Sequence, residues 1–243
     1  MEHLSQAAFD LLVENRLNDS KAFYDEHKPQ IEALVREPIF KIIEEVVPTL
    51  QKIDQEIILA PKRQISRIRR DTRFTNDKSL YRANVWAWLG RDKREWDNYP
   101  RFFFEVTPGY VWWGCGMYFA EPAMFESYRE MILSRDPVFM EAKESLEGQK
   151  RFSLDTDDMF KRTKYPNEPE DIRVWLDRKS IYVSHTEEDI SISFSDKLTK
   201  ALKRDYPKLK AYYKFLTTAY DRRQTPETIR PWSPHKNLRE DEW

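Results

Sequence analysis

Residues 101–119 have the sequence RFFFEVTPGYVWWGCGMYF, and this stretch decides the fold. Its two halves, 101–107 and 110–119, are rich in aromatic and β-branched residues, which favour extended strands. The link Thr107-Pro-Gly-Tyr110 between them is long enough only for a tight turn. We therefore expect the two strands to pair antiparallel, as a β-hairpin.

Helices are predicted before this hairpin. Apolar side chains recur at helical spacing over residues 4–12 and again over residues 23–46. Pro29 and Pro38 interrupt the second run, so we expect a kink there or two consecutive helices. Pro48 is expected to end it.

Helices also follow the hairpin. Pro122 is well placed as the first residue of one helix, and Asp136 and Pro137 begin another. A short helix is expected at 172–176. Two C-terminal helices close the fold, and Pro207 is expected to open the second of them.

The order of these elements indicates the fold class. Strand-like segments at 57–59, 65–70, 83–89 and 180–184 accompany the hairpin, and helices lie on both sides of them in sequence. Segregated strands and helices are typical of an α+β fold, whereas alternating βαβ units would indicate a parallel sheet. We expect a central, mainly antiparallel sheet that contains 65–70, 83–89, 101–107 and 110–119, with N-terminal and C-terminal helices packed on it. Residues 1–222 are predicted to form a single domain, and residues 223–243 a polar, proline-bearing tail.

The composition excludes several classes of function. Formal net charge is −1, with 41 basic and 42 acidic residues, which argues against a dedicated nucleic-acid binder. Five glycines and the absence of a glycine-rich phosphate motif argue against a nucleotide-cofactor site. Four scattered histidines without ligand spacing predict no metal site, and we expect no cofactor.

The same composition bears on the compartment. No apolar stretch approaches the roughly 20 residues that cross a bilayer, and the N-terminus lacks a signal-peptide pattern. The single cysteine, Cys115, fits a reducing environment. We therefore expect a cytoplasmic protein without membrane contact, and the sequence leaves the oligomeric state open.

Residues 67–82, RIRRDTRFTNDKSLYR, hold six cationic side chains, two carboxylates and a phenol. Such a density of complementary charge predicts either an internal ion-pair network or a cleft for a phosphate or carboxylate. In the cleft hypothesis the donors to the anion are drawn from this segment. They are Arg70, Arg73, Lys78, Tyr81 and Arg82. In the rival hypothesis, a structural or protein-interaction domain, Asp71 or Asp77 neutralises Arg70.

An enzymatic role is the third hypothesis for this segment. Asp71 or Asp77 would then act as the general base, and Tyr81 or Lys78 as the proton donor. Surrounding cations lower the pKa of a carboxyl group, and this weakens an aspartate as a base. Whether the protein is an enzyme therefore stays open at this point.

The second half of the hairpin supplies another candidate site. Gly114 and Gly116 stand at alternate positions of one strand and clear one face of it, for a ligand or for another backbone. Cys115 between them has no evident activator of its thiolate, so we expect a small core residue there.

The charged segment also carries a family resemblance. The pattern Arg70-Asp-Thr-Arg-Phe-Thr-Asn-Asp-Lys-Ser-x-Tyr-Arg82 resembles the signature of a mostly bacterial and also fungal family, domain of unknown function 2461. Weaker matches lie at 18–23, 114–118 and 160–162, and the resemblance covers roughly residues 8–222. Leu80 stands where the family usually has proline, which loosens the turn before Tyr81. Ala22 stands where it usually has tryptophan, which removes an aromatic contact. The resemblance supports a domain assignment and implies no particular chemistry.

Overall fold

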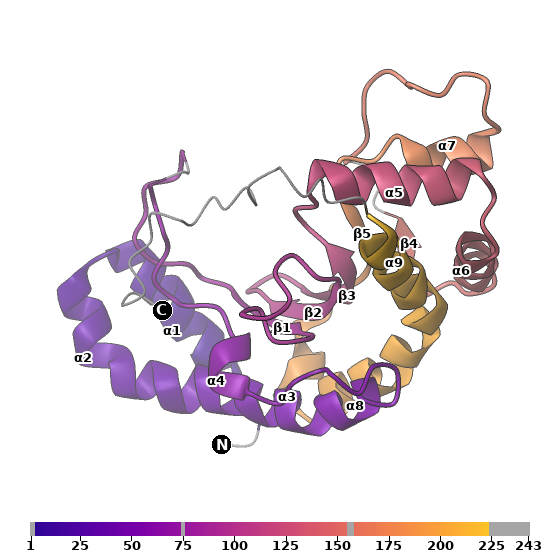
Figure 1. Ribbon diagram of the computed structural model, residues 1–243. Coiled ribbons are helices and arrows are strands. Elements are labelled where there is room, and N and C mark those ends of the chain that lie inside the picture. Colours follow the sequence, from indigo (N-terminus) through magenta and orange to yellow (C-terminus); the bar gives the residue numbers. More distant parts are fainter. Residues whose placement is uncertain (1–2, 74–75, 155–157, 224–243) are drawn as a thin grey trace.

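An antiparallel sheet lies at the centre of the protein (Figure 1). The computed structural model describes residues 3–73, 76–154 and 158–223, and within these ranges five strands form this sheet. Their order is β1-β2-β3-β5-β4, with every neighbouring pair antiparallel. The strands are β1 (Val85–Leu89), β2 (Arg101–Val106), β3 (Val111–Met117), β4 (Ser153–Leu154) and β5 (Ile181–Glu187).

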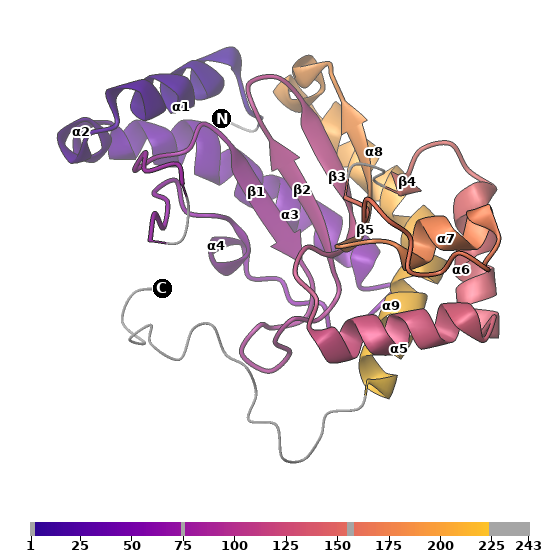
Figure 2. The same cartoon turned by 90° about the horizontal axis from the view of Figure 1, so that it is seen from above.

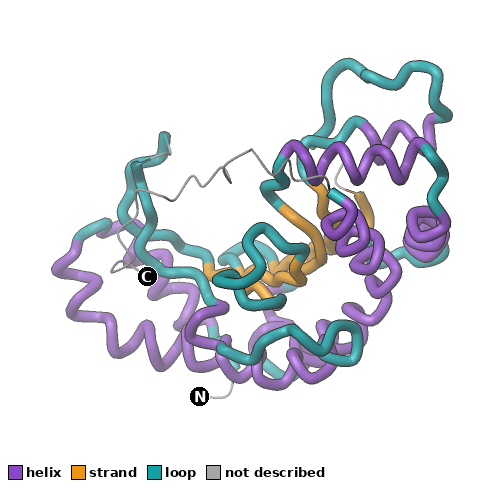
Figure 3. The backbone as a smooth tube through the Cα atoms, viewed as in Figure 1, coloured by secondary structure: helices purple, strands orange, loops and turns teal. Residues whose placement is uncertain are grey.

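Helices pack beside and below this sheet, so the predicted α+β class is confirmed (Figures 1 and 3). When the sheet is viewed from above, α3 and α8 pass behind the strands (Figure 2). The helices are α1 (Gln6–Asn18), α2 (Lys21–Ile31), α3 (Glu37–Leu50), α4 (Pro61–Gln64), α5 (Pro122–Leu133), α6 (Pro137–Glu147), α7 (Glu170–Leu176), α8 (Lys197–Asp205) and α9 (Lys210–Arg222). Shorter helical segments are η1 (Glu32–Arg36, π-helical), η2 (Ile190–Phe194) and η3 (Tyr206–Leu209), the latter two 3-10.

The two faces of the sheet differ in chemistry because alternate residues of a strand point to opposite sides. On β2, Phe102, Phe104 and Val106 are fully buried, whereas the residues between them stay partly exposed. The buried side chains join the apolar core against α3, α8 and α9. We call this the inner face, and the opposite side of the sheet the outer face.

The predicted hairpin is confirmed as β2 and β3. The Thr107 backbone N–H donates to the Tyr110 carbonyl at 3.0 Å, and the Thr107 hydroxyl accepts the Tyr110 N–H at 2.9 Å. β1 also forms where residues 83–89 predicted it, although it begins at Val85.

The prediction that 57–59 and 65–70 are strands is wrong. Residues 57–59 have no regular structure, and 65–70 lies beside β1 with only isolated bridges. Ser66 explains the interruption, because its hydroxyl accepts the Trp86 N–H at 3.1 Å and replaces a backbone acceptor. The segment then leaves β1, and Arg69 pairs with Tyr81 instead.

The N-terminal prolines are accommodated rather than disruptive. The π-helical segment Glu32–Arg36 joins α2 to α3 without a break, and Pro38 lies in the first turn of α3. The prediction that Pro48 ends the run is wrong, because α3 continues to Leu50. Val47 and Leu50 are fully buried, and this packing offsets the hydrogen bond that Pro48 cannot donate.

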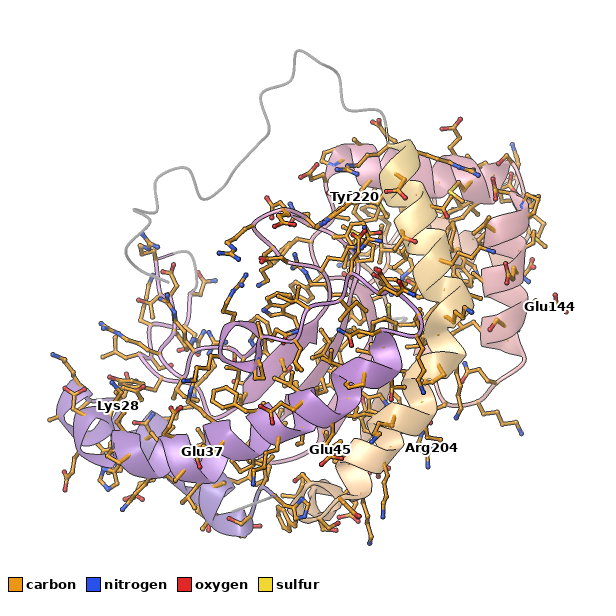
Figure 4. The ribbon with its side chains drawn as sticks, turned by 60° about the horizontal axis from the view of Figure 1, so that its bottom comes forward. Lys28, Glu37, Glu45, Glu144, Arg204 and Tyr220 are labelled. Atoms are coloured by element: carbon orange, nitrogen blue, oxygen red, sulfur yellow. The ribbon has the colours of Figure 1, made fainter. Side chains whose placement is uncertain are left out.

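The C-terminal helices return the chain to the sheet. Arg204 on α8 lies near Glu45 on α3, and Tyr220 marks the far end of α9 (Figure 4). Pro207 lies in the 3-10 segment before α9 and is not its first residue, which corrects the predicted start. Pro122 and Pro137 do open α5 and α6, as predicted. Of the predicted tail 223–243, residues 224–243 lie outside the described residues.

Candidate functional site

Asp77 is the centre of an ion-pair network in the charged segment. Its carboxylate accepts hydrogen bonds from Arg16 at 2.9 Å, from Arg70 and from both the hydroxyl and the N–H of Ser79. The Ser79 donors, followed by Arg16 and Arg70, hold the pKa of Asp77 well below its usual range. The sequence predicted Asp71 or Asp77 as the partner of Arg70, and Asp77 takes this role.

The other charges of the segment also have partners. The Arg73 guanidinium forms a salt bridge with Asp71 at 2.8 Å, and the Arg73 N–H donates to the same carboxylate at 3.1 Å. The Lys78 ammonium donates to the Thr72 carbonyl oxygen at 2.8 Å. Arg73, Lys78 and Asp71 are exposed at the surface. These contacts favour the ion-pair hypothesis for this part of the segment.

Tyr81 is buried, with 1% of its surface exposed, and its ring stacks on Tyr24 at 4.9 Å between centroids. Burial raises the pKa of its hydroxyl, and this makes it a weaker proton donor. One carboxylate oxygen of Asp19, at the end of α1, accepts the N–H groups of Leu80 at 2.6 Å and Tyr81 at 3.1 Å. A proline at position 80 has no N–H for this contact, so Leu80 fastens the turn instead of loosening it.

The hydrogen-bond partners of Asp71 and Asp77 and the burial of Tyr81 weaken the enzymatic hypothesis for the segment. Both carboxylates already accept hydrogen bonds from arginine side chains and backbone N–H groups. A general base must be free to accept a proton at the working pH. The depressed pKa of Asp77 and the buried ring of Tyr81 do not meet that requirement.

The strand glycines allow close backbone packing. A Cβ atom on Gly114 would lie 2.0 Å from the Val183 carbonyl oxygen, and Gly116 has a φ of +148°. Of the two occupants that the sequence left open, a neighbouring backbone fills this space. Cys115 between them is fully buried, and burial raises the pKa of its thiol, which is the environment of a core residue.

The outer face of the sheet carries a continuous aromatic surface. Phe103 and Trp112 lie 4.7 Å apart between ring centroids, and Tyr182 lies 6.0 Å from Trp112. The strand register places these residues on the same face of neighbouring strands. Figure 2 views the sheet from this face. The outer-face residues are Trp86, Trp88, Arg101, Phe103, Glu105, Trp112, Gly114, Gly116 and Tyr182.

Three cations border this aromatic surface: Arg82, Lys93 and Arg101. The Lys93 ammonium lies 4.5 Å from the Trp88 ring centroid, and the Arg101 guanidinium 5.1 Å from the same centroid. None of the three forms an ion pair with any other described residue. The Nε atoms of Arg82 and Arg101 are buried without a hydrogen-bond partner in the described part of the chain.

The pKa values of these cations record the loss of water around them. Desolvation and the neighbouring Arg101 together lower the pKa of Lys93 to about 8, although the residue is exposed and Asp97 partly offsets the shift. Desolvation also lowers the pKa of Arg82 and of Arg101. A nearby anion would offset the repulsion between Lys93 and Arg101.

Glu105 is the carboxylate of the outer face. It accepts a hydrogen bond from the Trp112 indole N–H at 2.6 Å and another from the Asn84 side-chain amide. Its charge attracts Arg82 without forming an ion pair. Glu105 thereby orients Trp112. Asp97 attracts Lys93 and Arg101 in the same way, without an ion pair, so two carboxylates face three cations.

Sequence reasoning named Arg82 but missed Lys93 and Arg101. The alternation along β2 was a usable signal for Arg101, because it places Arg101 on the same side as Phe103 and Glu105. Lys93 had no such signal. It reaches Trp88 only because the chain folds back after β1.

No group of three histidine, cysteine, aspartate or glutamate side chains that could hold a metal ion occurs in residues 3–73, 76–154 and 158–223. Within the same ranges, every helix is too short or too polar to span a bilayer.

Comparison with known proteins bears on the resemblance carried by Arg70–Arg82. A family model described as a conserved hypothetical protein, DUF2461, matches residues 7–215. Comparison with functionally curated proteins gives no match. The matched range includes the ion-pair network around Asp77 and the whole outer face of the sheet. The chain therefore belongs to the DUF2461 family.

Proposed function

We propose that this protein is a cytoplasmic domain that binds a small phosphate- or carboxylate-bearing ligand on the outer face of its sheet. Lys93 and Arg101, which lie against the same Trp88 ring, are the donors in this proposal, and Arg82, shortly before β1, is a third. The observation that carries it is that none of the three forms an ion pair in the described part of the chain. An excess of positive charge beside aromatic rings favours a ligand of the opposite sign.

The signature segment has two roles in this proposal. Arg82 belongs to the ligand site, and Arg70 supports it from the Asp77 network, close enough to lower the pKa of Arg82. Direct binding of the anion by Arg70, Arg73, Lys78 and Tyr81 stays a prediction, as does a ligand contact at Gly114 and Gly116. The internal partners of these residues make Arg82 the strongest candidate of the segment.

A structural or protein-interaction domain is the second candidate function. The observation in its favour is that Asp71, Asp77, Arg70 and Arg73 neutralise one another within the chain. This network would hold Asp71, Arg73 and Asp77 in place without any ligand. The two functions differ in whether Arg82 and Arg101 ever meet an anion.

A thermal-shift screen of phosphorylated and carboxylated metabolites tests the proposal. We expect at least one compound to raise the Tm of the wild type, and Arg82→Gln and Arg101→Gln each to weaken its binding. Loss of one charge-assisted hydrogen bond costs about 1.5–3 kcal/mol of binding free energy. Arg73→Gln is the matched control, because Arg73 pairs with Asp71, and it should bind as the wild type does. A screen in which no anion raises the Tm contradicts the proposal.

A further inference from the structure

Two exposed aromatic side chains extend the outer face at the end of β3. Tyr118 is 67% exposed and Phe119 is 79% exposed, and their rings meet edge to face at 4.7 Å. Neighbouring exposed rings are uncommon on a soluble surface, and they mark a contact site more often than an isolated one does. They have no role in the Asp77 network or in the apolar core.

Tyr118 connects this pair to the outer face. Its ring is stacked on Tyr182, with 6.3 Å between centroids and 24° between planes. Tyr182 in turn contacts Phe103 at 6.1 Å and Trp112 at 6.0 Å. The aromatic surface therefore continues without interruption from Trp112 to Phe119.

Two of the cations, Lys93 and Arg101, lie beside the strand end that carries the exposed rings. Arg101 on β2, Gly116 on β3 and Tyr182 on β5 are lateral neighbours, and the glycine places no side chain between the other two. Neighbouring strands are about 4.8 Å apart, so Arg101 and Tyr182 are separated by roughly 10 Å. Lys93 lies against the rings of Trp86 and Trp88, whereas Tyr118 and Phe119 are exposed.

We propose that the ligand is a small anion that also carries a flat ring, as a nucleoside monophosphate does. Its anionic group meets Lys93 and Arg101, and its ring stacks on Tyr118 and Phe119. This inference rests on the proposed function and adds to it that the ligand carries a ring. A free small molecule fits better than a nucleic-acid strand, because two cations offset one or two charges and the chain has a formal net charge of −1.

Isothermal titration calorimetry on the full chain tests whether the ligand carries a ring. The ring-bearing probes are adenosine monophosphate, uridine monophosphate and phenyl phosphate, and the ring-free probes are ribose 5-phosphate and inorganic phosphate. Stacking of a base on an aromatic side chain is worth about 1–3 kcal/mol, which corresponds to roughly 5-fold to 150-fold in affinity. We expect at least one ring-bearing probe to exceed the ring-free probes by that factor.

Variants separate this inference from the proposed function. Tyr118→Ala and Phe119→Ala should each remove most of the ring-dependent gain and leave the affinity for ribose 5-phosphate unchanged. Tyr110→Ala is the matched control, because Tyr110 is also exposed but lies in the turn at the other end of β3. Arg101→Gln should weaken the binding of both kinds of probe.

Three results would overturn the inference. If ring-bearing and ring-free anions bind with equal affinity and Arg101→Gln weakens both, the ligand needs no ring, while the anion site stands. A ten-nucleotide single strand that binds more tightly than every small probe refutes the commitment to a small ligand. If no phosphate probe binds the wild type, the ligand is not a ring-bearing phosphate. The carboxylates of the thermal-shift screen then decide whether the proposed function holds.

Discussion

The Lys93 ammonium lies 4.5 Å from the centroid of the Trp88 ring, on the outer face of the sheet. Arg101, the first residue of β2, approaches the same ring at 5.1 Å. Two cations that share one ring repel each other, and the ring only partly offsets this repulsion. An anion bound beside the pair would therefore lower the electrostatic energy.

Lys93 should make anion binding depend on pH. Desolvation lowers the pKa of Lys93 from 10.5 to about 8, so the free protein loses this charge as the pH rises through about 8. A bound anion favours the protonated ammonium, and its affinity should therefore fall above that pH. Titrations of the stabilising anion between pH 7 and pH 10 measure this fall.

Lys93→Arg is the control for that titration, because an arginine stays charged throughout this range. We expect the affinity of Lys93→Arg to be nearly constant between pH 7 and pH 10. An affinity of the wild type that is also constant would show that Lys93 does not contact the anion.

Asp19 should determine how firmly the signature segment is held. Asp19→Ala leaves the N–H groups of Leu80 and Tyr81 without their acceptor, and we expect it to lower the free energy of unfolding by about 2–3 kcal/mol. Asp19 has a φ of 45°, which asparagine tolerates, and Asp19→Asn keeps a side-chain oxygen. Its cost should stay below about 1 kcal/mol in urea denaturation. Equal losses in the two variants would mean that the hydrogen bonds to Asp19 are unimportant.

Gly114 should tolerate no side chain. A Cβ atom there would meet the Val183 carbonyl oxygen at 2.0 Å, so Gly114→Ala must push β5 away from β3. We expect a loss of about 3 kcal/mol or more in the free energy of unfolding. Gly109→Ala is the matched control, because a Cβ atom at Gly109 has no neighbour within 4 Å. Similar stability of the two variants would contradict the packing of β3 against β5.

Asp205 should stabilise the fold from below the sheet. It is fully buried and accepts hydrogen bonds from Arg151, Arg204 and Lys208 at 2.8–2.9 Å. Burial raises its pKa, but these three donors lower it more, and the net pKa lies below 3.8. Its contribution is therefore complete above pH 3.8 and is lost as the pH falls through the lower value of the folded protein.

Asp205→Asn tests this contribution at neutral pH. The substitution removes a buried carboxylate that pairs with three partly exposed cations, and we expect a loss of about 1.5–3 kcal/mol in urea denaturation. Asp196→Asn, which removes an exposed partner of Lys200, should change the stability little. An Asp205→Asn protein as stable as the wild type would refute the role of this cluster.

Local patterns in the sequence were enough to predict the hairpin at the centre of the fold. The aromatic and β-branched residues of 101–107 predicted β2, and Pro108-Gly109 allowed only a tight turn to β3. Residues 65–70 have an equally strand-like composition, but the Ser66 hydroxyl takes a backbone donor of β1 and interrupts the ladder. Composition does not report such a side-chain contact.

The candidate site was predictable only in part. The pairing of Arg70 with an aspartate followed from charge density, because a half-buried guanidinium needs a counterion. Arg16 joins the same carboxylate from α1, 61 residues earlier in the chain, and no local pattern indicates this contact. The approach of Lys93 and Arg101 to Trp88 likewise depends on strand register and on the path of the chain after β1.

The indole N–H signals of the tryptophans test the central claim most directly. Trp86, Trp88 and Trp112 belong to the outer face, whereas Trp113 and Trp175 are buried in the core. Their signals are assigned by single Trp→Phe substitutions in nitrogen-15 spectra, and the anion that raises the Tm is then added. We predict that the outer-face signals shift in proportion to the bound fraction while those of Trp113 and Trp175 stay in place. Stabilisation by the anion without a shift of any outer-face signal would contradict the account, because the ligand would then bind elsewhere.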